Sequence, residues 1–281
     1  MIDNIKALIV DIDGTLVVKG SIIMPQTRKA IDILQAEGVI MGLATGRLVD
    51  DYTRGYAKRW GLDWDFDVLI GANGGHLWDK WHPDEVEMFY PLSEADIKMI
   101  MDMVAPLNLN GQIYENSQLI AQRWDNLVAA SSLRNMQEVV ISPFPDRLYR
   151  RPNAKIQFRY EPDDAEHVLG FINALDLPDR IQHVVTYPGI VEFMDRRVDK
   201  GVALHRFAEK NNIPIENILT FGDAENDIAL VREAGWGVVL ANGSAETKAA
   251  GNDVTEYPVT EDGMGRYIFE KFLNPRGIYF E

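Results

Sequence analysis

The stretch KALIVDIDGT, residues 6–15, decides the fold predicted for this chain. Its first half is a short apolar run rich in β-branched residues, which indicates a buried strand. The run passes directly into Asp11 and Asp13, followed by a turn residue at Gly14. Side chains two residues apart on a strand point the same way, so two buried carboxylates there repel each other. Burying them requires a cation or a shared proton, and the pair therefore indicates a metal site.

Taken alone, this segment has a second interpretation, in which Asp-x-Asp-Gly is only a turn that ends a strand. A calcium-binding loop beginning at Asp11 is excluded, because that loop needs glycine at the position of Leu16 and glutamate at the position of Ile22. The two carboxylates need partners elsewhere in the chain before they indicate a function.

Several other short apolar runs are each followed by a helical pattern, which is typical of a parallel α/β sheet. The expected strands are residues 6–12, 39–44, 67–71, 217–221 and 237–240, and the expected helices are residues 26–37, 47–60, 199–212, 224–234 and 244–250. Their order suggests β-α-β crossovers. We expect a doubly wound, Rossmann-like parallel sheet, which binds ligands at the carboxyl ends of its strands.

The middle of the chain has a different pattern. Its expected strands are residues 112–122, 139–142, 154–160 and 181–193, and its expected helices are residues 93–105 and 162–175. Because α/β runs lie on both sides of this stretch, we expect a core domain interrupted by an insert. The expected core domain is residues 1–86 and 194–281, and the expected insert is an α+β cap domain of residues 87–193.

A second strand end carries Thr45, Gly46 and Arg47 at the expected start of a helix. A hydroxyl and free backbone N–H groups at such a position are suited to holding an anion. Taken alone, Thr45 is also explained as a helix N-cap. Its place at the end of a predicted central strand favours the anion site.

A third strand end is followed by four polar side chains in the segment 223–227, DAEND. Helix capping explains one of them, and oxygen ligands of this kind suit Mg²⁺. Lys200 stands at the start of the expected helix 199–212, where a cation opposes the helix dipole. A solvated lysine is the ordinary interpretation, but among these acids Lys200 can neutralise a phosphoryl group.

Composition limits the possible partners. The 281 residues carry a formal net charge of −15, which disfavours nucleic acids and anionic membranes as ligands. The absence of cysteine excludes disulfides, thiolate nucleophiles and cysteine-bound zinc. The N-terminal apolar run, Ala7 to Val10, fits neither a signal peptide nor a membrane span, so we expect a cytoplasmic protein.

The four segments, in this order, resemble the motifs of the haloacid dehalogenase-like hydrolase superfamily. Those motifs are an Asp-x-Asp-Gly-Thr strand end, a Ser or Thr strand end, a lysine, and a late acidic pair. The length and place of the insert, with Ala-Thr-Gly-Arg at 44–47 and Gly-Asp-x-x-Asn-Asp at 222–227, resemble the Cof-like subgroup with a large α/β (class IIB) cap. The insert itself carries no recognisable signature.

The resemblance implies a Mg²⁺-dependent phosphatase that acts on a small phosphorylated metabolite, a sugar phosphate or similar compound. Asp11 is then the nucleophile that forms an aspartyl-phosphate. Asp13 protonates the leaving oxygen and later activates water. Thr45 and Lys200 are expected to hold the phosphoryl oxygens.

The same resemblance implies a ligand set for Mg²⁺. Asp11 and Asp223 supply carboxylate oxygens, and Asp13 supplies its backbone carbonyl. The residues expected to support this shell are Asn226 and Asp227. The weaker candidates for substrate binding are Gly46, Arg47 and Asn73.

Two other functions remain open at this point. A phosphomutase uses the same phospho-aspartate but passes the phosphoryl group to a sugar hydroxyl instead of water. A metabolite-binding module could keep the fold without turnover, although such a module gives Asp11, Asp13, Lys200 and Asp223 no reason to coexist. The oligomeric state is not indicated by the sequence.

Overall fold

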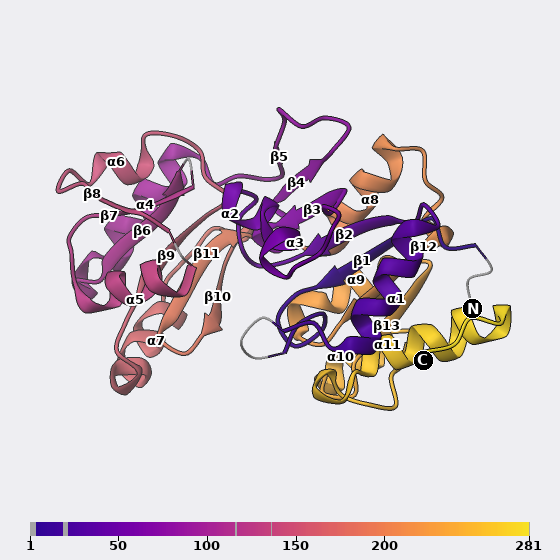
Figure 1. Cartoon of the computed structure of the whole chain (residues 1–281). Helices are drawn as coiled ribbons and strands as arrows, with labels where there is room; N and C mark the ends of the chain where they lie inside the picture. Colours follow the sequence, from indigo (N-terminus) through magenta and orange to yellow (C-terminus); the bar gives the residue numbers. More distant parts are fainter. Residues whose placement is uncertain (1–3, 19–21, 116, 136, 281) are drawn as a thin grey trace. The chain divides into compact units, whose positions relative to one another are not determined.

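The computed structural model describes residues 4–18, 22–115, 117–135 and 137–280. The chain divides into two compact units, each with its own sheet, whose elements are labelled in Figure 1. The first unit comprises Met1–Val49, Thr53–Glu87 and Asp199–Glu281, and the second comprises Asp50–Tyr52 and Met88–Val198. Among the described residues, no helix has both the length and the apolar composition needed to cross a membrane.

The sheet of the first unit has eight strands in the order β14-β13-β12-β1-β2-β3-β4-β5. They are β1 (Ala7–Asp11), β2 (Ile40–Ala44), β3 (Val68–Gly71), β4 (His76–Asp79), β5 (Glu87–Met88), β12 (Ile218–Gly222), β13 (Trp236–Val239) and β14 (Asp253–Val254). The strands from β14 to β3 run parallel, and β4 runs antiparallel to β3. The chain winds outward from β1 in both directions, which confirms the predicted doubly wound sheet.

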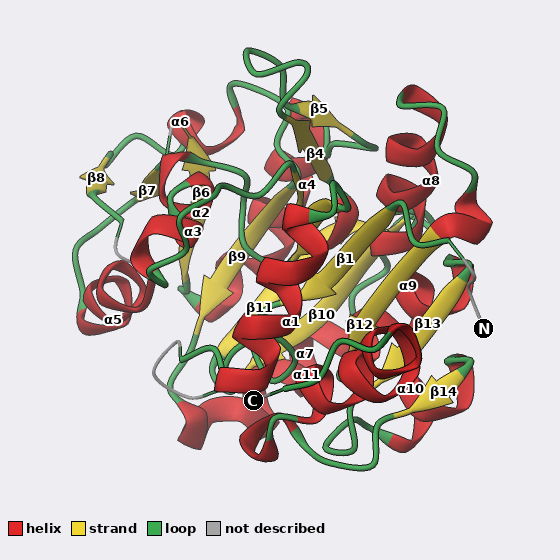
Figure 2. Cartoon of the chain, turned by 45° about the vertical axis from the view of Figure 1, so that its right-hand side comes forward, coloured by secondary structure: helices red, strands yellow, loops and turns green. Residues whose placement is uncertain are grey.

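Helices flank the strands of this sheet, as Figure 2 shows. They are α1 (Pro25–Ala36), α3 (Tyr56–Arg59), α8 (Lys200–Lys210), α9 (Ile228–Glu233), α10 (Ala245–Ala250) and α11 (Gly263–Ile268). The short helix α2 (Asp51–Arg54) contains residues of both units. Every residue of β1 is buried, because the strand lies in the middle of the sheet. The carboxyl end of β1 therefore places Asp11 away from bulk water.

The prediction of one helix over residues 47–60 is wrong. The segment from Thr45 to Asp50 is irregular, and two short helices, α2 and α3, follow it. The backbone carbonyl of Arg47 accepts a hydrogen bond from the N–H of Ala72, at 2.6 Å, so it is not available to a helical turn. The start of this segment is held by the β3–β4 connection instead of by helical hydrogen bonds.

The second unit contains a six-stranded sheet in the order β10-β11-β9-β6-β7-β8. Its strands are β6 (Asn110–Glu115), β7 (Gln118–Ala121), β8 (Val139–Ile141), β9 (Lys155–Arg159), β10 (Ile181–Tyr187) and β11 (Ile190–Asp195). All neighbours pair antiparallel except β7 and β8. Its helices are α4 (Glu94–Val104), α5 (Asn126–Asn135), α6 (Asp146–Tyr149) and α7 (Ala165–Asn173).

Two strands predicted in the insert are each a pair of strands. Residues 112–122 span parts of β6 and β7, and residues 181–193 span β10 and part of β11. The second pair turns at Gly189, whose φ is +82° and where a side-chain carbon would lie 2.7 Å from the carbonyl oxygen of Tyr160. Helices α5 and α6 were not predicted. Between the strands of each pair the sequence has turn-forming residues, Asn116-Ser117 and Pro188-Gly189, which the prediction of two uninterrupted strands did not use.

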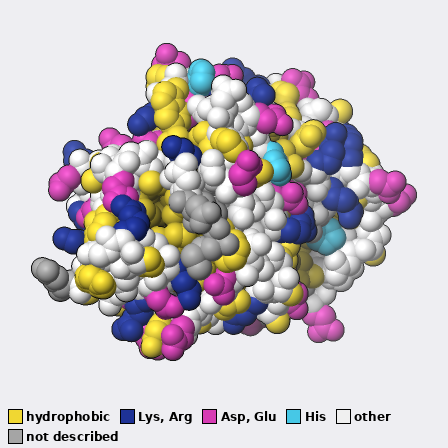
Figure 3. Space-filling view, turned by 90° about the vertical axis from the view of Figure 1, so that its right-hand side faces the viewer, with side chains coloured by type: hydrophobic (Ala, Val, Ile, Leu, Met, Phe, Trp, Pro, Cys, Tyr) yellow, Lys and Arg dark blue, Asp and Glu magenta, His cyan; other side chains and the backbone are white. Residues whose placement is uncertain are grey.

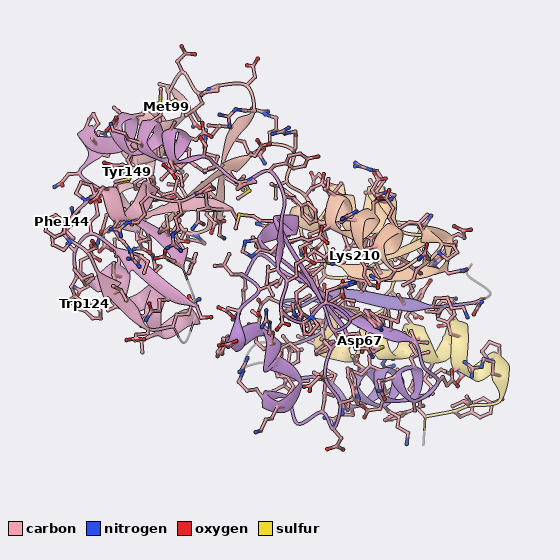
Figure 4. All side chains as sticks on the ribbon, turned by 90° about the horizontal axis from the view of Figure 1, so that it is seen from above. Asp67, Met99, Trp124, Phe144, Tyr149 and Lys210 are labelled. Carbon is pink, nitrogen blue, oxygen red and sulfur yellow. The ribbon has the colours of Figure 1, made fainter. Side chains whose placement is uncertain are left out.

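Charged side chains tie the elements of the first unit together. The Nζ atom of Lys210, at the end of α8, lies 2.9 Å from Glu87 Oε1 and 3.4 Å from Asp79 Oδ2. Separately, the carboxylate of Asp67 accepts a hydrogen bond from the N–H of Met41 at 2.8 Å. Figure 4 labels Lys210 and Asp67. On the face that Figure 3 presents, basic and acidic side chains are interspersed. These ion pairs connect α8 to the edge of the sheet formed by β4 and β5.

Helix α1 receives its N-terminal cap from the far end of the chain. Its own N-cap residue, Met24, offers no side-chain hydrogen bond. The buried carboxylate of Asp262, just before α11, accepts hydrogen bonds from the N–H groups of Gln26 (2.6 Å) and Thr27 (2.7 Å) and from the Thr27 hydroxyl (2.7 Å). A carboxylate is favoured at a helix N-terminus, so Asp262 joins α1 to the C-terminal segment.

We expect Asp262→Asn to lower the free energy of unfolding by about 1 kcal/mol, because a carboxamide has a single acceptor oxygen and no charge. Asparagine tolerates the positive φ of +65° at this position, so the backbone is not strained by the change. Urea denaturation measures the difference. The matched control is Glu261→Gln, which alters an exposed neighbour; equal losses in the two variants would contradict the capping role.

Candidate active site

The predicted site residues meet at the carboxyl edge of the first sheet. Asp11 at the end of β1 is paired in register with Ala44 at the end of β2, and β12 lies on the other side of β1. The winding of the chain reverses between β1 and β12. Ligands of doubly wound sheets bind in the crevice that such a reversal leaves outside the strand ends.

Lys200 is at the centre of this edge and is fully buried. Its Nζ atom donates to Asp11 Oδ1 at 2.6 Å, to Asp227 Oδ1 at 2.5 Å and to the backbone carbonyl of Ala44 at 3.0 Å. The side chain of Asp199 caps α8 by accepting from the N–H of Val202, which fixes the first turn that carries Lys200. An ammonium has three N–H donors, so those of Lys200 are all committed to protein groups.

The charged groups of this cluster shift one another's pKa values. Burial raises the pKa of the Asp11 carboxyl from its ordinary value of 3.8 to about 8, and Asp227 adds to the rise while Lys200 opposes it. Burial also raises the pKa of Asp223, although a hydrogen bond from Thr15 lowers it. For Lys200, burial acts to lower the pKa, but the carboxylates of Asp11 and Asp227 raise it above its ordinary value. Negative charge therefore exceeds positive charge among these buried groups.

Asp227 is committed to structural hydrogen bonds. Its Oδ1 atom accepts a hydrogen bond from Lys200 Nζ, and its Oδ2 atom accepts hydrogen bonds from the N–H groups of Asp223 and Ala224, both at 3.0 Å. A side-chain carbon at Gly222 would lie 2.5 Å from the Asp227 Cβ atom, so glycine is needed there. These contacts fix the loop after β12 and aim Asp223 at the site.

Asp223 is held by two residues that the sequence did not single out. Its Oδ1 atom accepts from the Thr15 hydroxyl at 2.7 Å, and its Oδ2 atom lies 3.3 Å from the amide nitrogen of Asn242. Asn242 also donates to the carbonyl of Gly14 at 2.9 Å, which connects the two acidic loops. Asn242 follows β13, so the rule that polar residues at strand ends gather at one edge would have identified it.

The donor set of the site fits a hard divalent cation. Oxygen atoms of Asp11, Asp223 and Asp227 lie within 4.8 Å of one another. Asp11 and Asp223 are the better ligands, because Asp227 is fully buried and already accepts hydrogen bonds from the Lys200 ammonium and from two backbone N–H groups, whereas Asp223 is only partly buried. Among the described residues, Asp11 Oδ2 has no partner, and a cation bound by this cluster would offset the excess negative charge.

The expectation that Asp11 and Asp13 are two buried carboxylates on one strand is wrong for Asp13, because β1 ends at Asp11 and the carboxylate of Asp13 lies outside this acidic cluster. Its side chain is 65% exposed, and Asp13 Oδ2 is 3.2 Å from Arg47 Nη2. The predicted metal ligand at this position is the backbone carbonyl, so an exposed side chain is compatible with that prediction. An exposed carboxyl two residues after a buried one is placed to exchange protons with a ligand and with water.

The predicted anion-binding residues lie beside Asp11. Thr45 is buried, and its hydroxyl oxygen accepts from the N–H of Arg47 at 3.2 Å, which leaves the hydroxyl proton available to a ligand. Asn73 donates its N–H to the carbonyl of Thr45 at 3.1 Å. The structure thus brings Thr45, Gly46, Arg47 and Asn73 together at one end of β2.

Comparison with known proteins extends these observations. A family model described as haloacid dehalogenase-like hydrolase matches residues 8–268. The sequence is 28% identical over 265 residues to a 5-amino-6-(5-phospho-D-ribitylamino)uracil phosphatase of Bacillus subtilis (strain 168), a match that covers 94% of this chain and 95% of that protein.

Two solved structures illustrate the shared fold. A haloacid dehalogenase-like hydrolase from Bacteroides thetaiotaomicron has a TM-score of 0.83 at 21% identity, covering 96% of this chain and 100% of that chain. A subclass IIB sugar phosphatase has a TM-score of 0.73 at 20% identity, covering 94% of this chain and 98% of that chain. The likeness extends over both units of the chain.

The raised pKa of Asp11 predicts how stability depends on pH in the absence of divalent cations. Between the ordinary value of 3.8 and the folded value of about 8, the folded chain keeps a proton on Asp11 that the unfolded chain has released. Each rise in pH within this window therefore favours unfolding, by at most about 1.4 kcal/mol per pH unit.

Thermal unfolding of Asp11→Asn in EDTA should lack most of this slope, because the variant has no carboxyl to titrate at this position. The matched control is Asp13→Asn, whose exposed carboxylate pairs with Arg47 and whose loss should leave the slope in place. A wild-type protein whose stability rises steadily from pH 5 to pH 8 would contradict the excess of buried negative charge.

Proposed function

The chain belongs to the haloacid dehalogenase-like hydrolase family, and from this premise we propose that it is a Mg²⁺-dependent phosphatase that acts through an aspartyl-phosphate on Asp11. The observation that best supports the proposal is the buried Lys200, whose Nζ atom lies 2.6 Å from Asp11 Oδ1, while Asp11 Oδ2 has no partner in the part of the chain that the structure describes. A carboxylate oriented through one oxygen presents the other for attack.

In the first step, Asp11 Oδ2 attacks the phosphorus of the ester. A bond forms between this oxygen and phosphorus, and the bond between phosphorus and the leaving oxygen breaks. Asp13 gives its proton to the leaving oxygen, so the product is a neutral alcohol and not an alkoxide. Arg47, 3.2 Å from Asp13 Oδ2, stabilises the carboxylate that Asp13 becomes.

In the second step, water attacks the phosphorus of the aspartyl-phosphate. Asp13 accepts a proton from that water, and the bond between phosphorus and Asp11 breaks. Inorganic phosphate leaves, and both carboxyl groups return to their starting protonation states. Two easier displacements thus replace one difficult displacement.

Asp11 and Asp223, with the backbone carbonyl of Asp13, are the proposed ligands of Mg²⁺, and Asp227 and Asn226 support them. When bound, Mg²⁺ supplies positive charge that lets an anionic nucleophile and an anionic phosphoryl group approach each other. The raised pKa of Asp11 in the metal-free protein supports this requirement, because the nucleophile must be ionised.

The phosphoryl oxygens are assigned to Thr45 and Lys200. Thr45 has a hydroxyl proton to donate. Lys200 must exchange its hydrogen bond to the carbonyl of Ala44 for one to the substrate, because its donors are all in use. In either arrangement Lys200 neutralises Asp11 and Asp227 as phosphate charge arrives.

The predicted insert, residues 87–193, is the proposed cap domain that contacts the leaving group. We assign the leaving group to a small soluble alcohol, such as a sugar, and we place the reaction in the cytoplasm. The relative from Bacillus subtilis that acts on a phosphoribityl compound supports a polyhydroxylated leaving group.

Phosphate release from a panel of sugar phosphates, nucleotides and pyridoxal phosphate tests the proposal. We expect Mg²⁺-dependent release by the wild type and none above background by Asp11→Asn, because no aspartyl-phosphate can form. The control Glu261→Gln, which changes an exposed carboxylate, should retain full activity. An isomerised sugar phosphate without phosphate release would show a mutase, and tight binding without turnover would show a binding module.

The role of Asp13 predicts a dependence on the leaving group. We expect Asp13→Asn to lower the steady-state rate on alkyl phosphates by about 10²- to 10⁴-fold. With p-nitrophenyl phosphate, whose leaving group needs no proton, the variant should release a burst of p-nitrophenol equal to the enzyme concentration and then turn over slowly. A variant with the same loss on both substrates and no burst would contradict general acid catalysis by Asp13.

A further inference from the structure

The connection between β3 and β4 is strained beside the active site. Ala72 and Asn73 both have left-handed backbone conformations, with φ of +50° and +55°. Such conformations are costly for residues other than glycine, least so for asparagine, and persist only where surrounding contacts impose them. Two such residues in succession indicate that contacts with the surrounding structure, and not local backbone preference, determine the conformation of this loop.

Contacts on both sides impose this path. The N–H groups of Ala72 and Asn73 donate to the carbonyls of Arg47 (2.6 Å) and Thr45 (3.1 Å). On the other side, a side-chain carbon at Gly74 would lie 1.8 Å from the carbonyl oxygen of Asp199, the residue before Lys200. The loop is therefore compressed between the segment that carries Thr45 and the start of α8.

The side chain of Asn73 connects two further parts of the site. Its Oδ1 atom accepts a hydrogen bond from Asn226 Nδ2 at 3.0 Å. The same oxygen would lie 3.0 Å from a side-chain carbon at Gly46, so it passes directly over the Gly46 backbone. Asn73 thus joins the loop after β2 to the loop after β12.

This contact determines which end of the Asn226 carboxamide faces the anion-binding segment. An accepting oxygen on Asn73 requires that Asn226 present its NH₂ group and not its carbonyl. One N–H of that group is used by Asn73, and among the described residues the second has no acceptor, so it can donate to a ligand. A reversed carboxamide would instead direct a carbonyl dipole at the phosphoryl oxygens.

We propose that Asn73 is a positioning residue, which orients the Asn226 amide as a donor to the transferring phosphoryl group. This inference rests on the proposed phosphatase function and assigns a role within it. Asn73 acts through Asn226 and does not itself contact the leaving group. Its contribution should therefore be the same for every ester that the enzyme hydrolyses.

Asn73→Gly tests the side chain separately from the backbone, because glycine adopts the left-handed conformation without strain. We expect kcat/KM to fall roughly 3- to 10-fold, the value of one hydrogen bond, by the same factor across the ester panel. The inhibition constant of inorganic phosphate should rise by a similar factor. Ala72→Gly is the matched control, since it changes a neighbouring left-handed residue and keeps its N–H group.

A double-mutant cycle identifies the route of the effect. Asn73→Gly should cause no further loss in an Asn226→Ala background, because the group that it orients is absent. Two additive losses, or an Asn73→Gly variant with wild-type kcat/KM, would overturn the proposal. A loss that varies strongly with the leaving group would also overturn it.

Nuclear magnetic resonance separates this inference from the phosphatase assignment. The side-chain amide resonances of Asn226, identified by their disappearance in Asn226→Ala, should shift in Asn73→Gly and not in Ala72→Gly. In Mg²⁺ and inorganic phosphate they should shift in the wild type and respond less in Asn73→Gly. If the wild type hydrolyses no ester, the proposed function fails, while unchanged Asn226 resonances in Asn73→Gly would overturn the positioning role.

Discussion

The buried ammonium of Lys200 is the interaction on which the site depends. It holds Asp11 and Asp227 within 2.6 Å of a single nitrogen, and without it two buried carboxylates would face each other in a medium of low polarity. Because the carboxylates outnumber the ammonium group, the cluster keeps a negative charge that attracts a cation. Three carboxylates around one ammonium leave a site that suits a divalent cation, which the proposed reaction requires.

Asp227 and the glycine-containing loops convert this electrostatic arrangement into geometry. Asp227 accepts hydrogen bonds from two backbone N–H groups and from Lys200 Nζ, so it fixes the loop that carries Asp223. Gly222 leaves room for the side chain of Asp227, and Gly14 leaves room for the carboxylate of Asp223. The charged residues are thus aimed by neighbours whose own hydrogen bonds are complete.

Much of the core could be predicted from sequence because it consists of short, fully buried runs that end in polar residues. Asp11, Thr45 and Asp223 were found at strand ends, and parallel strands bring such ends to one edge. The prediction of a helix over residues 47–60 was wrong, because the carbonyl of Arg47 accepts a hydrogen bond from Ala72 in the later connection between β3 and β4. Asn242 also follows a strand and could have been found by the same rule, whereas Asp262 acts 235 positions from Thr27, and no local pattern reports that contact.

The interrupted first unit has a consequence for how the protein is made. Asp11 leaves the ribosome 189 residues before Lys200, and the segment Met88–Val198 is synthesised between them. The second unit is nearly continuous in sequence, so its sheet can form while the first remains half built. Asp11 therefore lies beside an incomplete sheet until β12, β13 and β14 have been synthesised, and a chain that stops before residue 200 contains Asp11 without Lys200.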